Sequence, residues 1–232
     1  MLRLVLWLCM LISAICRHDT PIVIERPMNR VEFDDLLMEY NQDQGPHRNM
    51  SVAIEITVNS ARLSEDVLRT SLTIEQTWND DRLVFKGSSE VPLPANTHVW
   101  YPDTMIINAL SNKVKASSMF LNYDGTLRER QLCNVEVVCE ESKPDNENLR
   151  CPITLTSFSS RGVDYMQYTI NMIDIDHVNR ILNATISYET KTDHRNRTSS
   201  LAHAILYLRK PHHPLGDFIE EFSKAAHLQG EH

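Results

Sequence analysis

Two short groups of residues could bind a metal ion. Asp174, Asp176 and His177 form a D-x-D-H group, and His212 lies beside His213. Carboxylates and imidazoles are common ligands of divalent cations, but a protein site usually draws on a second ligand cluster at recognisable spacing. Neither group has such a partner in the sequence, so we predict no metal site and no cofactor.

Motifs for covalent or phosphoryl chemistry are also missing from the sequence. It contains no G-x-S-x-G elbow, no Gly-rich phosphate loop and no H-E-x-x-H. Cys133 has no neighbouring histidine in the sequence that would activate its thiol. His194, Arg195 and Arg197 could engage an anion, although a basic loop tip is more often simply solvated. These observations favour a binding protein over an enzyme.

The N-terminus predicts a secretory leader. Arg3 precedes the apolar residues 4–12, which are followed by the small residue Ala14. Cleavage after Cys16 would make residues 1–16 the signal peptide. The apolar block is shorter than the roughly 20 residues that a membrane-spanning helix needs. No later stretch of that length is free of charges, so we expect a secreted, extracellular protein without a membrane span.

The three remaining cysteines would then lie in an oxidising compartment. Cys133, Cys139 and Cys151 allow one disulfide and leave one free thiol. The net charge of −8 argues against nucleic acid as a partner. Three N-x-[ST] sequons are candidate glycosylation sites in a secreted chain, and they begin at Asn49, Asn183 and Asn196.

The periodicity of apolar residues predicts one helix followed by strands. Phe33, Leu36, Leu37 and Tyr40 follow the i, i+3, i+4, i+7 spacing of an amphipathic helix over residues 31–41. Alternating or strand-like patterns then predict strands around residues 52–58, 72–78, 119–123, 132–138, 153–158, 165–173, 180–188 and 203–208. We therefore predict an all-β fold, an immunoglobulin-like antiparallel β-sandwich with one N-terminal α-helix.

The domain limits follow from the same patterns. With 42% apolar residues the chain can bury one sizeable core. We expect a single domain over residues 17–215 and a short polar or amphipathic tail over residues 216–232. The polar residues 189–200 are expected to form a long hairpin loop.

Three motifs occur in a characteristic order. They are WNDDRL at residues 78–83, VWYPDT at 99–104 and NYDGTL at 122–127, where Asp-Gly is a strong hairpin turn. In this order and at these intervals they resemble motifs of the extracellular ligand-binding domain of Cys-loop neurotransmitter-gated channels. The helix resembles the N-terminal helix of that family, and the likeness covers roughly residues 30–215. It marks Trp78, Trp100, Pro102 and Asp103 as motif residues, for which core and loop scaffolding is the main expectation.

The resemblance also implies a disulfide. The segment that begins at Cys151 resembles the one after the second cysteine of the family's loop, which makes Cys139 the first cysteine. The loop is shortened, and residues 143–145 depart from its usual aromatic-Pro-x-Asp pattern. Cys133 remains an alternative partner for Cys151. Cys133 and Cys139 cannot bridge each other, because they lie about 20 Å apart along one extended strand.

Family members bind a small transmitter between two subunits of a pentamer, in a box of aromatic side chains that holds a cation. The resemblance places Ile107, Phe158 and Tyr188 on one side of such a site and Thr73 on the other. Only two of these four are aromatic, so a polar ligand fits better than a strongly cationic one. Phe158 and Tyr188 have simple packing as the alternative role.

These features imply a soluble homologue that binds a small neurotransmitter-like ligand, or modulates receptor signalling, within a homo- or hetero-pentamer. Two alternatives stay open. The chain could be an interaction protein without a ligand that regulates the assembly of full-length channel subunits. It could also be a truncated channel subunit, because residues 208–211 resemble the basic segment before the first membrane span.

Overall fold

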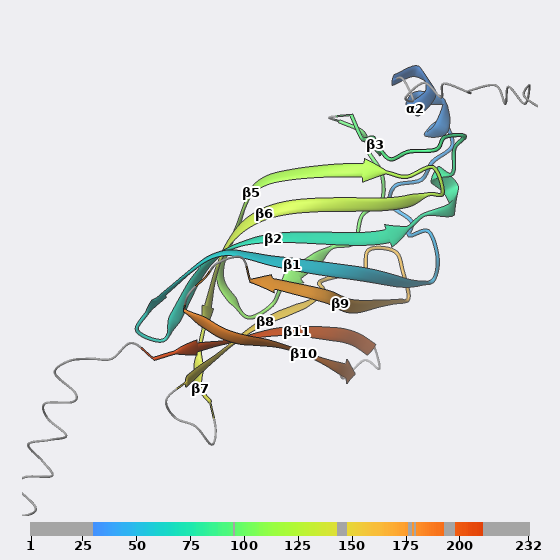
Figure 1. The fold of residues 1–232 in the computed structure, drawn as a ribbon. Coiled ribbons are helices and arrows are strands. Elements are labelled where there is room, and N and C mark those ends of the chain that lie inside the picture. The colour runs from blue at the N-terminus through green and yellow to red at the C-terminus, as the bar shows by residue number, and fades with distance from the viewer. Residues whose placement is uncertain are drawn as a thin grey trace, which may run out of the picture.

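The computed structural model describes residues 30–94, 96–142, 148–175, 178, 180–192 and 198–210, and they form a two-sheet β-sandwich (Figure 1). The larger sheet has the order β3-β5-β6-β2-β1-β9, with strands β1 (Asn49–Ser64), β2 (Val67–Asn79), β3 (Val91–Pro92), β5 (Ala109–Leu121), β6 (Thr126–Val138) and β9 (Tyr165–Ile175). The smaller sheet has the order β10-β11-β8-β4, with β4 (Thr104–Ile106), β8 (Asn148–Ser157), β10 (Ile181–Thr192) and β11 (Thr198–Arg209), and β7 (Glu140–Glu141) pairs with β8. The predicted all-β sandwich is confirmed.

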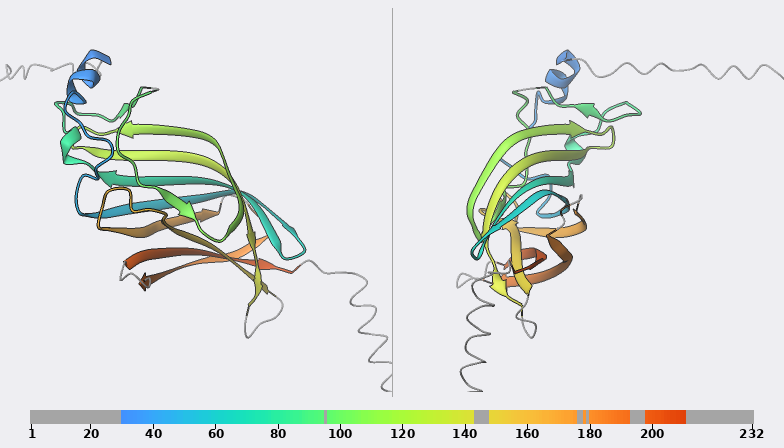
Figure 2. Two further views of the ribbon diagram at one scale, coloured as in Figure 1. Left: turned by 180° about the vertical axis from the view of Figure 1, so that it is seen from behind. Right: turned by 60° about the vertical axis from the view of Figure 1, so that its left-hand side comes forward.

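The alternation of side chains explains how the sheets pack. In β1, Val52, Ile54, Ile56 and Val58 are all buried, while the residues between them face outward. The buried faces of both sheets meet in one core, and Figure 2 shows the larger sheet curving over the smaller one. Burial of each such aliphatic side chain stabilises the fold by roughly 1.5–3 kcal/mol.

The strand pairs are antiparallel with one exception in the described residues. β1 pairs with β9 in parallel, from Asn49 opposite Tyr165 to Val58 opposite Ile175. In the described ranges, no helix combines the length and apolar character needed to cross a bilayer.

The N-terminal helix is shorter than predicted. Helix α2 spans Arg30–Leu36, whereas the periodicity predicted a helix over residues 31–41. After Leu36 the backbone forms turns with hydrogen bonds three residues apart. The amide of Met38 donates to the Asp35 carbonyl, and the amide of Tyr40 donates to the Leu37 carbonyl. The apolar spacing continues past the helix because Tyr40 is anchored by contacts of its own, described below.

The hairpin between β10 and β11 also differs from the prediction. The long loop expected over residues 189–200 is wrong for most of its length, because Glu189 pairs with Leu201 and Thr192 pairs with Thr198. Backbone hydrogen bonding can extend a strand through polar residues that face solvent. Residues 193–197, which include His194, Arg195, Arg197 and the sequon at Asn196, lie outside the described residues. The predicted leader 1–16 and tail 216–232 also lie outside them.

The motif residues are part of the scaffold. The rings of Trp78 and Trp100 are buried and meet edge to face with their centres 6.4 Å apart. The predicted Asp-Gly turn is present. Gly125 has a φ of +82°, and a Cβ there would lie 2.5 Å from the carbonyl oxygen of Asp80, so only glycine fits.

A buried carboxylate ties the helix region to this turn. Asp80 is fully buried and accepts hydrogen bonds from the Arg82 guanidinium and from the hydroxyl of Tyr40, at 2.6 Å for the latter. The same hydroxyl accepts from the amide of Trp100 at 2.9 Å. Burial and then the bond to Asp80 raise the pKa of Tyr40 well above its ordinary value, so the hydroxyl keeps its proton.

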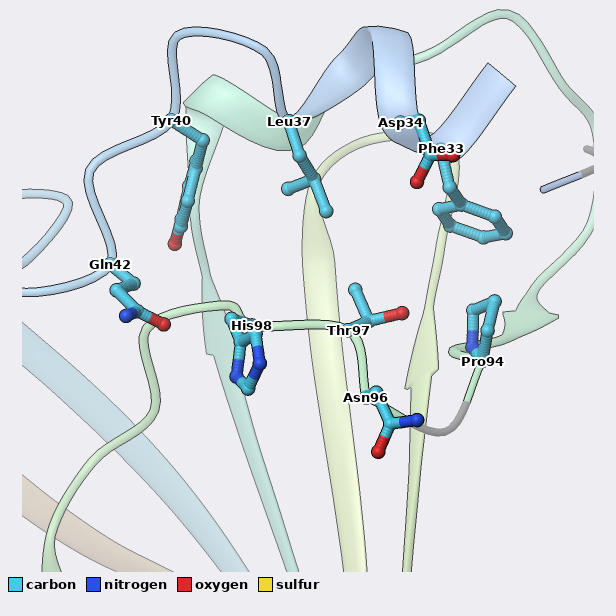
Figure 3. Close-up of a pocket in the computed structure, with 9 residues that line it drawn as sticks. All are labelled: Phe33, Asp34, Leu37, Tyr40, Gln42, Pro94, Asn96, Thr97 and His98. Atoms are coloured by element: carbon cyan, nitrogen blue, oxygen red, sulfur yellow. The ribbon is translucent and has the colours of Figure 1, made fainter. Parts of the chain in front are cut away.

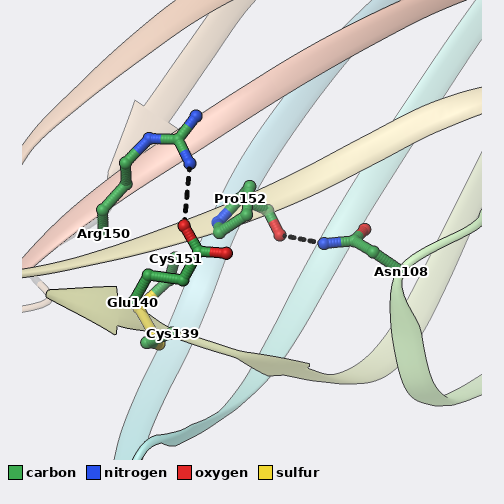
Figure 4. Close-up of a disulfide and its surroundings, with 6 residues drawn as sticks. All are labelled: Asn108, Cys139, Glu140, Arg150, Cys151 and Pro152. Carbon is green, nitrogen blue, oxygen red and sulfur yellow. Dashed lines mark hydrogen bonds and ion pairs between the residues drawn. A yellow bond between two sulfur atoms is a disulfide. The ribbon is translucent and has the colours of Figure 1, made fainter.

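The disulfide joins Cys139 to Cys151 with their Cα atoms 4.2 Å apart (Figure 4), as the resemblance implied. Cys133 is buried and free, which excludes it as the partner of Cys151 in this structure. Beside the bridge, Arg150 forms an ion pair with Glu140 at 3.6 Å. The bridge therefore links the end of β6 to β8 and joins the two sheets.

Candidate ligand-binding faces

One candidate face is a shallow groove on the outward side of the six-stranded sheet, which we call the groove face. It has a volume of about 290 Å³ and is lined by Thr73, Ala116, Ser117, Ser118, Arg130 and Leu132. The strand register brings these residues together, because Thr73 of β2 is opposite Leu132 of β6, which is opposite Ala116 of β5. Thr73, one of the four ligand-site residues predicted from the sequence, therefore lies in this groove.

Two arginines at or near the groove face differ in whether they are paired with carboxylates. Arg128 lies over the Phe120 ring and is paired with Glu90 at 2.6 Å and with Glu75 at 2.9 Å. The hydrogen bond to Glu90 is the largest cause that raises the pKa of Arg128. Arg130 makes no hydrogen bond or ion pair with any residue that the structure describes. Its guanidinium is exposed and is available to an acceptor from outside the chain.

A second candidate face, the loop face, contains Ile107 and Phe158. Ile107 follows β4 and is 47% exposed, and Phe158 follows β8 and is 79% exposed. Ile107 lies on the outward side of the smaller sheet, since Ile106 before it points into the core. Two apolar side chains are therefore presented to solvent at opposite ends of the stretch where β4 pairs with β8.

The backbone beneath the loop face is held firmly by side chains. The Asp103 carboxylate accepts hydrogen bonds from the hydroxyls of Ser157 and Ser159 and from the amide of Ser159, and the Asp103 carbonyl accepts from the Phe158 amide. The Asn108 side-chain amide donates to the carbonyl of Pro152 at 2.7 Å (Figure 4). Its side-chain oxygen accepts from the backbone amide of Thr154. The exposed ring of Phe158 thus projects from a fixed backbone.

The structure does not bring Tyr188 to the loop face. Tyr188 of β10 is opposite the buried Ala202 of β11, so it lies on the side of the smaller sheet that faces the larger one, although 54% of its surface is exposed. Its hydroxyl donates to the carbonyl of Ile170 at 3.0 Å and accepts from the amide of the same residue at 3.1 Å. Tyr188 therefore satisfies the free edge of β9.

The outward side of the smaller sheet carries a polar row that sequence reasoning missed. His203 Nδ1 lies 3.0 Å from the Thr154 hydroxyl, and its Nε2 lies 3.8 Å from the Glu189 carboxylate. The signal in the sequence was a histidine between the apolar residues Ala202 and Ala204 of a predicted strand. This row stands beside the backbone of Ile107, whose amide donates to the carbonyl of Thr154.

A buried hydrogen-bonded chain crosses the core from β5 to β4. The Ser117 hydroxyl of β5 donates to Glu129 at 2.9 Å, and the Gln76 amide donates to the same carboxylate at 2.7 Å. The hydroxyl of Thr104 in β4 then donates to Gln76 at 2.6 Å and lies 3.1 Å from the hydroxyl of Tyr168. Glu129 and Gln76 are both buried, so this polar chain satisfies groups that would otherwise be costly to bury.

The metal candidates gain no support. The described ranges contain no cluster of three or more His, Cys, Asp or Glu side chains placed to hold a metal ion. Asp174 is described in β9 and is exposed. Asp176, His177, His212 and His213 lie outside the described residues.

Comparison with known proteins agrees with this architecture. A family model described as the neurotransmitter-gated ion-channel ligand binding domain matches residues 30–203, from helix α2 into strand β11. A search of curated proteins found no match. The matched segment is three-quarters of the chain and contains both candidate faces and the disulfide. The chain therefore belongs to the family of neurotransmitter-gated ion-channel ligand-binding domains.

Proposed function

We propose that this chain is an extracellular subunit that assembles side by side with copies of itself or with related subunits and binds a small polar ligand at the junction. In this arrangement the loop face of one subunit covers the groove face of the next. The observation that carries the proposal is Phe158, a phenylalanine with 79% of its surface exposed on a backbone pinned by Asp103. An exposed aromatic ring on a rigid support is typical of residues that anchor an interface.

The chemistry of the two faces favours a ligand with an anionic or strongly accepting group. The groove face offers the Arg130 guanidinium, which has no partner among the described residues, and the hydroxyls of Thr73 and Ser118. The loop face adds one aromatic ring, and Tyr188 is engaged with β9, so a complete aromatic box for a cation is lacking in this subunit. We infer that an amino acid or another carboxylate fits these faces better than a quaternary amine.

The assembly is tested by light scattering on the secreted, deglycosylated protein. Phe158→Ser should shift the wild-type oligomer toward monomer, because it removes the apolar anchor without changing any buried contact. Met38→Ser is the matched control, since Met38 is 77% exposed and lies in the turn after α2, outside both faces. A wild-type protein that stays monomeric at high concentration would refute the proposal.

Ligand binding is tested by calorimetry with glutamate, glycine and acetylcholine. Arg130→Gln should weaken the binding of carboxylate ligands about tenfold or more, the scale of a lost hydrogen bond between charged groups. Arg69→Gln is the control on the same sheet, because Arg69 is exposed and paired with Glu136. Acetylcholine binding stronger than that of the amino acids would contradict the assigned ligand class.

A second candidate function is assembly without a small ligand, as an interaction protein that joins or regulates channel subunits. The engaged hydroxyl of Tyr188 and the non-aromatic Ile107 and Thr73 favour it, since Phe158 is then the one aromatic residue of the four that has no polar group bound within the chain. The two candidates differ in one result. The interaction protein requires that Phe158→Ser disrupts assembly while Arg130→Gln changes no measurable binding.

Secretion and glycosylation are part of the proposal. The leader over residues 1–16 supplies the route, and exposed sequon residues support modification. Asn49 is the exposed first residue of β1, and Asn183 is exposed on β10.

A further inference from the structure

A second cavity lies at the end of the sandwich that carries α2 and shares no residue with the groove face or the loop face. It has a volume of about 370 Å³, within the range of small-molecule sites. It lies between α2 with its following turn and the loop before Trp100 (Figure 3). Its lining residues are Phe33, Asp34, Leu37, Tyr40, Gln42, Pro94, Asn96, Thr97 and His98.

The cavity is lined by both apolar and polar residues. Phe33 is almost fully buried, and Leu37, Tyr40 and Pro94 are partly buried. In Figure 3 the ring of Phe33 lies above Pro94, and Leu37 points toward the opposite loop. A lining of this kind can bury the body of an aromatic or aliphatic ligand.

The polar side chains of the lining are free to bind. Among the described residues, the side chains of Asp34, Gln42, Asn96, Thr97 and His98 make no hydrogen bond or ion pair with one another or with any other residue. These polar groups therefore have unused hydrogen-bonding capacity, and in Figure 3 the side chains of Asp34 and Thr97 point into the space between the helix and the loop. Asp34 is the formally charged group of the lining at neutral pH, so the lining is acidic.

One wall of the cavity is fixed in place. Tyr40 is held by Asp80, Arg82 and the amide of Trp100, and the Arg82 guanidinium lies 4.4 Å from the centre of its ring. On the other side, the amide of Thr97 donates to the carbonyl of Pro94 and closes the loop. A ligand would meet a site that is already formed, which limits the entropy lost on binding.

We propose that this cavity binds a small organic amine with an aromatic body. The ammonium group would lie at the Asp34 carboxylate, and the apolar body would lie against Phe33, Leu37 and Pro94. Gln42 and Thr97 would form hydrogen bonds with further polar groups of the ligand. The site is contained in one subunit and requires no neighbouring chain, which separates it from the proposed site between subunits.

The test uses phenethylamine as the probe on the full secreted chain, with 2-phenylethanol and phenylacetate as uncharged and anionic analogues. Calorimetry and ligand-observed NMR at millimolar probe should show saturable binding of the amine and weaker or no binding of its analogues. Asp34→Asn should weaken amine binding about two- to fivefold, as expected for one exposed ion pair. Asp35→Asn is the matched control, because Asp35 is exposed on the same helix but does not line the cavity.

A second variant keeps the test independent of the charge. Thr97→Trp should fill the cavity from its exposed loop and abolish binding of the amine, while circular dichroism confirms that the fold persists. No saturable binding, equal binding of phenylacetate, or equal loss in Asp34→Asn and Asp35→Asn would overturn the proposal.

The outcome is distinguishable from that for the site between subunits. Amine binding that is unchanged in Arg130→Gln and in the monomeric Phe158→Ser protein supports the cavity, even if no oligomer forms. Amine binding that is lost in those variants and kept in Thr97→Trp assigns the ligand to the junction and refutes the cavity.

Discussion

The hydroxyl of Tyr40 offers a sharp test of how the helix region is held. It donates to Asp80 at 2.6 Å and accepts from the Trp100 amide at 2.9 Å and from Arg82 at 3.0 Å. Tyr40→Phe removes this one oxygen and keeps the ring. All three partners then lose a hydrogen bond at once.

The magnitude follows from the partners. Loss of the bond to the buried Asp80 carboxylate removes a charge-assisted interaction of about 1.5–3 kcal/mol, and the Trp100 amide is left unsatisfied at a cost of about 1–3 kcal/mol. Arg82 is partly exposed and keeps its two bonds to Asp80, so its share is small. Phenylalanine is easier to bury than tyrosine, which offsets part of the loss. We expect a net decrease of about 2–4 kcal/mol in the free energy of unfolding.

The assay is urea unfolding followed by tryptophan fluorescence, with the disulfide intact and the linear extrapolation applied to a two-state transition. Tyr123→Phe is the matched control, because the Tyr123 side chain is partly exposed and its hydroxyl makes no bond to a described residue. The control should change stability by less than about 0.5 kcal/mol. A Tyr40→Phe protein as stable as the control would show that the network contributes nothing and would refute the reasoning.

Three further outcomes are expected. Replacing Cys139 and Cys151 by serine should lower the free energy of unfolding by about 3 kcal/mol, because a bridge across a 12-residue separation restricts the unfolded chain by about that amount. An unchanged urea midpoint would contradict this. The Cys133 thiol should resist Ellman's reagent in the native protein at about pH 8 and should react once the protein is unfolded. Burial and then the charge of Glu129 raise the pKa of this thiol, so little reactive thiolate is present in the native state. A rapid reaction in the native protein would exclude the buried position. Asn183→Gln should remove one glycan from the mass of the protein secreted by animal cells, and an unchanged mass would show that this sequon is unused.

The sequence predicted the elements whose side chains carry a clear pattern. Val52, Ile54, Ile56 and Val58 revealed β1 because a strand buries every second residue. The helix limit was wrong because Tyr40 continues the apolar spacing for a different reason, its anchorage to Asp80. Periodicity records which residues are buried and carries no information on the backbone that holds them.

The limits of the hairpin and the role of Tyr188 were hidden for related reasons. Residues 189–192 are polar and face solvent, so their pairing with β11 left no apolar alternation to detect. A tyrosine on a strand can contact a ligand or satisfy a strand edge, and only the position of Ile170 decides between them. Arg130 was missed because the availability of a guanidinium depends on which carboxylates its neighbour Arg128 engages.

The parallel pairing of β1 with β9 has a consequence for synthesis of the chain. Asn49 is opposite Tyr165, so the edge of β1 stays unpaired until the ribosome has made more than a hundred further residues. During that interval β1, β2 and β6 can already form their local antiparallel ladders, which leaves a long apolar strand edge open to other nascent chains. Contacts so distant in sequence also slow folding. The late arrival of β9 is therefore the step at which the open edge of β1 is no longer exposed to aggregation.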